Sequence, residues 1–271
     1  MPDVAIQRWI PDRWDEVVGN DELRRFFWRE LTAIKRSIAQ TGTVPATAYK
    51  TLLVVGDNRT GKTALIKLFL RSLACLEPDA DFNPCRRRCS ICRQLPEKLS
   101  VEGLWSRICI GHDALPVDIK VVDCAKCEGA SHLRKMLEEV HNWDDGLGVV
   151  FFDEAQRLRN GMGYEMMLKD MEEKNVLWIF CSARPRELDA MFLERCIILS
   201  TQLPTFAELE AWLAGRCVAW GIPYDPEAIA LVARRSNRKP GLCLPALTQA
   251  SVTEAGLTVD FVENRWIVRP D

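Results

Sequence analysis

Residues 51–73 read TLLVVGDNRTGKTALIKLFLRSL, which is a short apolar run, a loop with two glycines and a helical sequence. Within this stretch, residues 56–63 match the pattern G-x-x-x-x-G-K-[ST] in full. Glycines let such a loop curl, so that its N–H groups face a phosphate at the start of the following helix. A strand–helix turn without a ligand does not require the complete pattern, so the stretch predicts a nucleotide-phosphate site.

The loop supplies the residues expected to hold ATP and Mg²⁺. Lys62 would reach the β- and γ-phosphates, and the hydroxyl of Thr63 would ligate Mg²⁺. Backbone N–H groups of the neighbouring positions would surround the phosphates. The predicted nucleotide-binding residues of the loop are Gly56, Asp57, Asn58, Arg59, Thr60, Gly61, Lys62, Thr63 and Ala64.

A second motif, VVFFDE at residues 149–154, is an apolar strand that ends in two acids. Asp153, at the carboxyl end of this strand, can hold Mg²⁺ as a Walker B acid does. Glu154 can polarise the attacking water as a general base. Two surface acids would explain the motif if it stood alone, but a complete phosphate loop accompanies it. Together the two motifs predict both binding and hydrolysis of ATP.

Apolar runs with little alternation are typical of strands that are covered on both faces of a parallel sheet. Between these runs lie helical stretches such as SHLRKMLEEVH, residues 131–141, whose apolar residues share one helix face. Alternating strands and helices predict a doubly wound α/β domain with a five-stranded parallel sheet. The predicted strands are TLLVV (51–55), DIKVVD (118–123), GVVFFD (148–153), VLWIFC (176–181) and CIILS (196–200).

After residue 200 the strand-like runs stop and helical sequence follows. Thr205 and Glu208 fit a capping box, and Phe206 is expected to face inward with the apolar positions that follow it. Two further helices are expected to begin at Asp225-Pro226 and after Pro240-Gly241. The sequence therefore predicts a small helical subdomain on the C-terminal side.

Composition limits the partners and the compartment. The chain of 271 residues has a formal net charge of −2, so any contact with nucleic acid must come from a local patch. The N-terminus has no apolar segment of a secretory signal, and no apolar run is long enough to span a membrane. The 11 cysteines are an odd number, which argues against a fully paired disulfide framework. We therefore expect a reducing cytoplasm, where clustered cysteines more often bind metal.

The order of the motifs resembles the clamp-loader branch of AAA+ ATPases, and within it the gamma/tau subunits of bacterial DNA polymerase III. The resemblance is carried by RWIPDRWDEVVG (8–19), MLKDMEE (167–173), WIFCSARP (178–185) and ERC (194–196) around the two nucleotide motifs. It implies an AAA+ P-loop NTPase fold with a C-terminal helical lid. It also implies that Pro11 and Val18 line the adenine pocket and that Ser182 is the sensor 1 residue.

Arg195 takes the place of the family's arginine finger, so the resemblance implies that it reaches the γ-phosphate held by a neighbouring subunit. A helix-terminal arginine that complements the helix dipole is the alternative. The lid departs from the family because Leu244 replaces the sensor 2 arginine. Arg238 or Lys239 is the available substitute, and the sequence does not decide between them.

The resemblance implies an AAA+ α/β nucleotide-binding domain at 1–202, which contains a zinc-binding insertion at 75–95. A helical lid at 203–250 and a C-terminal tail at 251–271 follow. Clamp-loader subunits continue into a helical collar that holds a pentamer together. This chain ends at residue 271, so we expect its assembly either to differ from that of the family or to rely on AAA+ contacts alone.

Cys75, Cys85, Cys89 and Cys92 follow the phosphate-loop helix with the spacing C-x9-C-x3-C-x2-C. Four thiolates suit tetrahedral Zn²⁺, and the segment between them has no apolar core of its own, so we predict a closed structural zinc site. The family carries a similar module at this point. Reduced thiols without metal are the alternative.

The other cysteines form no comparable set. Cys124 and Cys127 fit half a zinc site or a redox pair, but two packing cysteines are the simpler interpretation. Cys181 and Cys196 are expected to be small residues of buried strands.

Basic residues cluster at Arg86-Arg87-Arg88 and at Arg234-Arg235 with Arg238-Lys239, and either cluster could touch phosphate backbones, although such runs are usually solvated faces. The resemblance implies a Mg²⁺- and ATP-dependent ATPase of DNA replication. Other AAA+ subunits, DNA and a sliding clamp or polymerase subunits would be its partners. Two alternatives remain: a collarless regulator of a mobile element, and a structural subunit that holds ATP without cleaving it.

Overall fold

The computed structural model describes residues 9–41, 43–45, 50–99, 106–110, 117–127, 130–141, 147–158, 166–168, 170–171 and 176–267.

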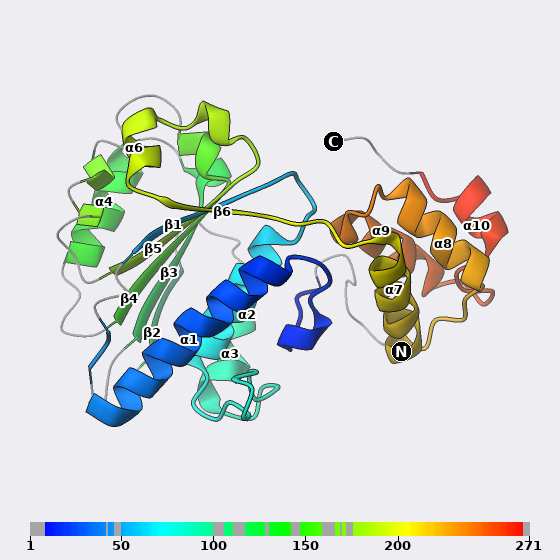
Figure 1. Ribbon diagram of the computed structural model, residues 1–271, viewed down its shortest axis with the longest axis horizontal. Helices are drawn as coiled ribbons and strands as arrows, with labels where there is room; N and C mark the ends of the chain where they lie inside the picture. Colours follow the sequence, from blue (N-terminus) through cyan, green and yellow to red (C-terminus); the bar gives the residue numbers. More distant parts are fainter. Residues whose placement is uncertain are drawn as a thin grey trace.

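A sheet with the strand order β2-β3-β4-β5-β1-β6 forms the centre of the α/β domain (Figure 1). The five predicted strands are present and run parallel to their neighbours. The sixth strand, β2, pairs antiparallel with β3 and is an addition to the prediction. The bounds are β1 (Thr51–Val55), β2 (Ser106–Ile110), β3 (Val117–Asp123), β4 (Leu147–Asp153), β5 (Val176–Ser182) and β6 (Ile197–Ser200).

Helices cover both faces of the sheet, because successive apolar side chains of the strands point to opposite sides. Phe27 of α1, Leu65 of α2 and Leu95 of α3 share one buried cluster with alternate residues of the strands. Leu133 of α4 and Phe192 of α6 belong to the cluster on the other face. The helices are α1 (Asp21–Thr41), α2 (Lys62–Ala74), α3 (Ser90–Leu99), α4 (Ala130–His141) and α6 (Ala190–Glu194).

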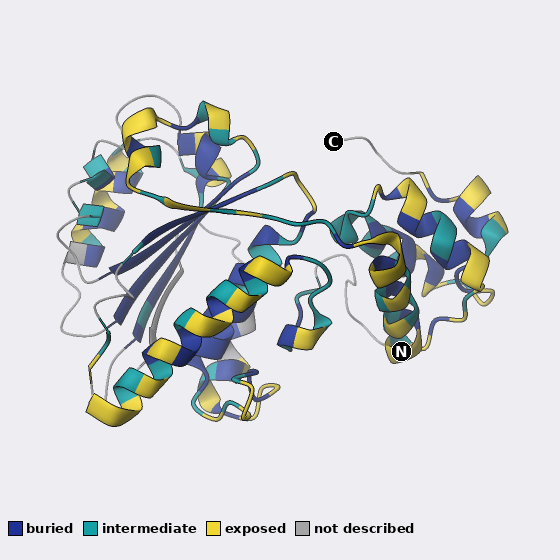
Figure 2. Cartoon of the chain, in the orientation of Figure 1, coloured by how far each residue is buried: buried dark blue, intermediate teal, exposed yellow. Residues whose placement is uncertain are grey.

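The last strand departs from the sequence prediction. The residues of β6 were expected to be buried, but Ile197 is 39% and Ile198 is 51% exposed. The reason is the position of β6, which pairs with β1 alone among the described strands and forms the outer edge of the sheet. Figure 2 shows this edge in exposed and intermediate colours beside the buried inner strands. The domain thus presents an apolar strand edge to solvent.

A helical lid follows the sheet and lies at the other end of the molecule (Figure 1). It consists of α7 (Phe206–Trp220), α8 (Pro226–Arg235), α9 (Pro240–Ala250) and α10 (Val259–Asn264), which enclose their own buried cluster. Phe261, Val262 and Trp266 belong to this cluster, so the segment after residue 250 contributes to the lid core. No helix in the described ranges is long and apolar enough to cross a membrane.

The predicted helix starts of the lid are present, with one difference in packing. Thr205 and Glu208 form the capping box of α7, and α8 and α9 begin at Pro226 and Pro240. Phe206, however, is 45% exposed and does not face the core. Its ring lies under the guanidinium of Arg238, 5.5 Å from the Cζ atom.

Residues 9–20 form a strap that connects the lid to the α/β domain. The ring of Trp9 lies 5.9 Å from that of Trp212 and 5.7 Å from that of Trp220, measured between centroids. Glu16 forms an ion pair with Arg216 at 3.3 Å, and its carbonyl oxygen accepts a hydrogen bond from Trp212 Nε1 at 2.8 Å. The first described residues therefore pack directly against α7.

The same strap contacts the segment that follows α2. The backbone N–H of Trp14 donates to Asn83 Oδ1 at 2.7 Å, and Arg13 pairs with Asp79 at 3.1 Å. Because Asn83 is buried and also donates to Asp79, the contact is an ordered one rather than a loose surface pair. The strap thus joins the lid and the cysteine-containing segment.

Candidate functional site

The phosphate loop lies at the carboxyl end of β1, between β5 and β6, at the point where the sheet order reverses. Gly56 has φ +153° and Gly61 has φ +95°. A Cβ atom on Gly56 would lie 1.7 Å from Thr201 Oγ1, so no larger residue fits there. Gly61 is the last residue before α2, whose first residue is Lys62. The glycines of the motif therefore meet a steric need of this turn.

The ammonium group of Lys62 lies inside the loop. Its Nζ donates to the carbonyl oxygens of Gly56 at 2.8 Å and Asp57 at 2.7 Å. Burial lowers the pKa of Lys62, while Cys181, Glu154 and other acidic groups nearby oppose this shift. The geometry holds a buried cation at the centre of the turn, where it can exchange carbonyl oxygens for phosphate oxygens.

Thr63 and Asp153 meet although they are far apart in the sequence. Thr63 Oγ1 lies 3.0 Å and 2.9 Å from the two carboxylate oxygens of Asp153, at the end of β4. Burial raises the pKa of Asp153, while the hydrogen bond from Thr63 and the charge of Lys67 oppose the shift. A hydroxyl and a half-buried carboxylate are oxygen ligands that fit Mg²⁺. Together they could hold the ion beside the loop.

Glu154 follows Asp153 with φ +57°, an uncommon conformation for a residue other than glycine. Its Oε2 accepts a hydrogen bond from Gln156 Nε2 at 2.5 Å, and Gln156 Oε1 accepts from the N–H of Ala183 at 3.3 Å. Gln156 is buried and links the acidic pair to the end of β5. The sequence alone did not predict a role for Gln156. The one feature of the sequence that could have indicated it is its position two residues after the acid pair.

Ser182, the expected sensor 1 residue, is buried at the end of β5 beside β1. Its Oγ accepts a hydrogen bond from the N–H of Arg184 at 3.0 Å, and its carbonyl oxygen accepts from Gly56 at 3.3 Å. The structure thus brings Ser182 to the start of the phosphate loop. Its role as a sensor remains a prediction.

The two expected residues of the adenine pocket lie in different surroundings. Val18 packs against the lid core. Pro11 is buried, and its carbonyl oxygen accepts from Arg71 on the second half of α2 at 3.3 Å. Arg71 is nine residues beyond Lys62, or about 13 Å along the helix. Val18 therefore lies where the strap meets the lid, whereas Pro11 lies where the strap meets the second half of α2.

Asn20 is a second residue that sequence reasoning missed. It is 2% exposed, its Nδ2 donates to the carbonyl oxygen of Thr60 at 2.9 Å, and its Oδ1 accepts from Gln202 at 2.8 Å. With φ +58°, it adopts a conformation that asparagine tolerates better than most residues. The feature of the sequence that could have indicated a role for Asn20 is its position directly after Gly19, the last residue of the motif at 8–19. Asn20 connects the strap, the phosphate loop and the segment leading to the lid.

The three lid residues considered for the sensor 2 position contact three different parts of the molecule. Leu244 packs against the lid core. Arg238 Nη1 donates to the carbonyl oxygen of Pro204 at 3.5 Å. Lys239 Nζ lies 3.3 Å from Asp57 Oδ2 and is thus the residue of this set that meets the phosphate loop.

Arg195 is exposed directly after α6, where its Nη1 donates to the carbonyl oxygen of Met191 at 2.9 Å. The next residues lead into the exposed strand β6. This position fits a residue that acts across an interface, and it also fits the helix-terminal alternative.

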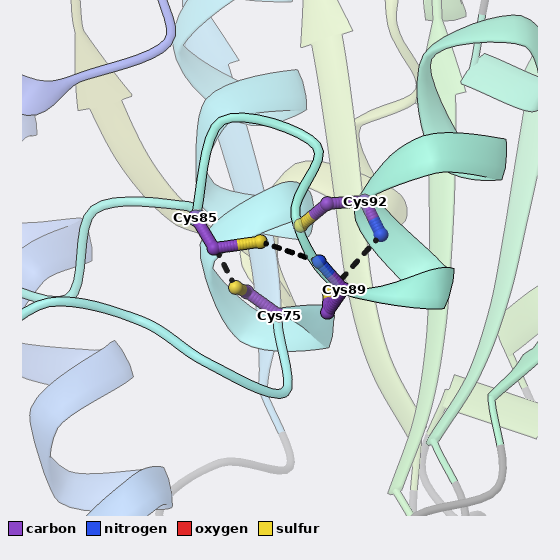
Figure 3. A group of neighbouring side chains, drawn as sticks. All are labelled: Cys75, Cys85, Cys89 and Cys92. Atoms are coloured by element: carbon purple, nitrogen blue, oxygen red, sulfur yellow. Dashed lines mark hydrogen bonds between the residues drawn. The ribbon is translucent and has the colours of Figure 1, made fainter.

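The four cysteines of the predicted zinc site come together. Their Sγ atoms all lie within 4.8 Å of one another, and all four residues are buried. Figure 3 shows the side chains pointing toward one another from the end of α2, the loop and the start of α3. Zinc–sulfur bonds of about 2.3 Å require sulfur separations of about 3.8 Å, so the cluster fits a tetrahedral ion after small movements.

Backbone hydrogen bonds in the cluster favour thiolates. The N–H groups of Cys85, Cys89 and Cys92 donate to the sulfur atoms of Cys75, Cys85 and Cys89, at 3.2–3.3 Å. The hydrogen bond with Cys92 lowers the pKa of Cys75 to about 5, whereas the same bond raises the pKa of Cys92 and burial raises that of Cys85. Because metals bind the thiolate, this donor set suits zinc.

The remaining cysteines are consistent with packing roles. Cys124 is buried and Cys127 is half-buried, and burial raises the pKa of both thiols. Cys181 is fully buried, whereas Cys196 is half-buried just before β6. The described part of the chain therefore contains a single cluster of cysteines that could hold a metal.

The basic runs are partly solvated. Arg86, Arg87 and Arg88 are exposed on the loop between Cys85 and Cys89. Arg235 is engaged within the lid, where its Nη1 donates to the carbonyl oxygen of Val262. The run at residues 86–88 is thus the more accessible one.

No protein-family model matches the chain. The gamma/tau subunit of DNA polymerase III from Mycoplasma genitalium is 24% identical over 200 residues, covering 72% of this chain and 28% of that protein. The tau/gamma subunit from Haemophilus influenzae is 20% identical over 239 residues, covering 86% and 30%. The chain thus spans less than a third of these relatives. These similarities support the resemblance to clamp-loader AAA+ proteins.

Solved structures agree on the fold. The RuvB Holliday junction branch migration motor of Thermotoga maritima aligns with a TM-score of 0.58 and 16% identity, covering 95% of this chain and 71% of that one. A mutant of the same protein aligns with a TM-score of 0.57. The chain has the AAA+ P-loop fold.

Proposed function

We propose that the protein is a Mg²⁺-dependent ATPase. The observation that carries this proposal is the meeting of Thr63 and Asp153 at 2.9–3.0 Å beside a complete phosphate loop. Lys62 would bind the β- and γ-phosphates, and Thr63 and Asp153 would hold Mg²⁺. The ion supplies charge neutralisation on the phosphates when it is bound. Glu154 would orient the attacking water and accept its proton.

The work that ATP drives is proposed from the family. Curated relatives are DNA polymerase III subunits, and we infer a clamp-loader-like role in DNA replication. Assembly with other AAA+ subunits would use the β6 edge and bring Arg195 to a neighbouring nucleotide. DNA, and a sliding clamp or polymerase subunits, would be the partners. A reducing cytoplasm would keep the cysteines available for zinc.

A steady-state ATPase assay with and without primed DNA tests this function. Hydrolysis that needs Mg²⁺ and rises with DNA is the expected result. Hydrolysis unaffected by DNA would contradict the replication role but not the ATPase. Absence of both hydrolysis and ATP binding would overturn the whole proposal.

Lys62→Ala is expected to weaken ATP binding by at least about 100-fold, because a buried cation that faces the phosphates is removed. The affinity of a fluorescent ATP analogue measures the effect. Lys50→Ala is the matched control, since Lys50 stands at the opposite end of β1 and its side chain pairs with Glu30 at 4.0 Å. Equal loss in both variants would indicate general damage to the strand.

We also propose that Cys75, Cys85, Cys89 and Cys92 bind one structural Zn²⁺, since four protein ligands leave no open position. Cys89→Ser, or removal of zinc by a chelator, is expected to lower the free energy of unfolding by more than about 2 kcal/mol. Metal analysis and thermal melting measure the two effects. Cys196→Ser is the control and should keep its zinc. A wild-type protein without zinc that melts no higher after zinc is added would contradict the site.

A further inference from the structure

The N-terminus of α9 touches the phosphate loop directly. The N–H of Gly241 donates to the carbonyl oxygen of Arg59 at 3.0 Å. A Cβ atom on Gly241 would lie 3.0 Å from the Cα, Cβ and carbonyl oxygen of Arg59, so the two backbones are in close contact. A movement of α9 therefore cannot leave this part of the loop unchanged.

A lysine stands at this junction. Lys239 is the residue before α9, and its Nζ lies 3.3 Å from Asp57 Oδ2. The Lys239 side chain is only 16% exposed, whereas that of Asp57 is 71% exposed. An ion pair with one partner so exposed to water is weak. Asp57 is thus a partner of this covered cation that a stronger anion can readily replace.

Asp57 has a second cation nearby. Its carbonyl oxygen accepts a hydrogen bond from Lys62 at 2.7 Å. Two lysines, one from the loop and one from the lid, therefore converge on the same loop residue. A triphosphate in the loop would carry more negative charge than the Asp57 carboxylate, and it would compete with that carboxylate for Lys239 and with the loop carbonyl oxygens for Lys62.

The other lid candidates are turned elsewhere. Arg238 reaches the carbonyl oxygen of Pro204 and lies over Phe206. Leu244, at the family's sensor 2 position, packs with the lid core. Of these three residues, Lys239 is the one whose side chain contacts the phosphate loop, which gives this lid a cation at a position different from that of the family pattern.

We propose that Lys239 is the nucleotide-sensing residue of the lid and exchanges the Asp57 carboxylate for the terminal phosphates of a bound nucleoside triphosphate. This inference rests on the proposed ATPase function. Asp57 acts as a competing anion that holds Lys239 near the loop and is displaced when the triphosphate binds. Because a diphosphate lacks the terminal group, Lys239 discriminates between ATP and ADP.

The test compares the affinities of fluorescent ATP and ADP analogues in three variants of the full chain. Lys239→Ala is expected to weaken ATP binding by roughly 10-fold and ADP binding by much less, as loss of a charge-assisted hydrogen bond predicts. Arg238→Ala is the matched control, with both affinities unchanged. Asp57→Asn removes the competing anion, so its ATP affinity should exceed that of the wild type.

Two outcomes would overturn the inference. In one, Lys239→Ala leaves the ratio of ATP to ADP affinity unchanged. In the other, Asp57→Asn loses ATP affinity as Lys239→Ala does, which would mean that the ion pair only holds the lid in place. Lys239→Arg keeps the charge and should retain the preference for ATP. Thermal melting of every variant checks its folding.

The same titrations distinguish this failure from failure of the proposed function. If the wild type binds ATP and Lys62→Ala does not, but Lys239→Ala behaves as wild type, only the role of Lys239 is wrong. If the wild type binds no nucleotide, the ATPase proposal fails first.

Discussion

Arg195→Ala is expected to lower kcat of the assembled protein by roughly 10³–10⁵-fold, the range found for arginine fingers. ATP binding to the separate subunit should change little, because Arg195 is exposed at the end of α6 and its Nη1 donates to the carbonyl oxygen of Met191. The measurements are steady-state hydrolysis at a concentration where subunits associate, and ATP affinity at a concentration where they do not.

A mixing experiment shows whether the arginine acts on a neighbour. The Arg195→Ala subunit keeps its nucleotide site, and the Lys62→Ala subunit keeps its arginine. Each variant alone should be inactive, whereas a mixture should recover part of the hydrolysis if Arg195 acts in trans. Arg186→Ala, a change at another exposed arginine preceding α6, should leave hydrolysis unchanged. Inactive mixtures of variants that still associate would support the helix-terminal alternative.

Glu154→Gln is expected to reduce turnover by roughly 10²–10⁴-fold while ATP remains bound, because the amide cannot accept the proton of the attacking water. The loss should appear in kcat rather than in the affinity for ATP. Pre-steady-state hydrolysis and retention of labelled ATP separate these quantities.

The neighbours of Glu154 allow a second check on this mechanism. Gln156 donates to the Glu154 carboxylate, so Gln156→Ala should lower kcat by misplacing the base without removing it. Glu254→Gln, at an exposed position of the lid, should leave hydrolysis unchanged. Normal turnover in Glu154→Gln would contradict the assignment of the general base.

The sequence was sufficient for the parallel part of the sheet because buried parallel strands are nearly continuous apolar runs. It failed for β2, where the short run SRICI at residues 106–110 pairs as an antiparallel edge. It also failed for the exposure of β6, since composition does not distinguish an edge strand from an inner one. Both errors concern the edges of the sheet, which depend on strand order rather than on local pattern.

The residues of the candidate site likewise fall into those that a local motif predicts and those that depend on contacts with distant segments. The phosphate loop and the acids after β4 are local motifs, so residue spacing alone located them. Gln156 and Asn20 act through contacts with distant segments, and no spacing rule marks them. Arg238 and Lys239 are adjacent in the sequence, and only the direction of each side chain at the start of α9 separates their contacts.

The strap formed by residues 9–20 has a consequence for the order in which the chain folds. Trp9 and Glu16 find their partners in α7, so their contacts close a loop of about two hundred residues. During synthesis the strap leaves the ribosome before α7 does, so it cannot dock until residue 220 has followed. Such non-local contacts form late. The strap is therefore expected to be among the last of the described segments to become protected from proteolysis as the new chain matures.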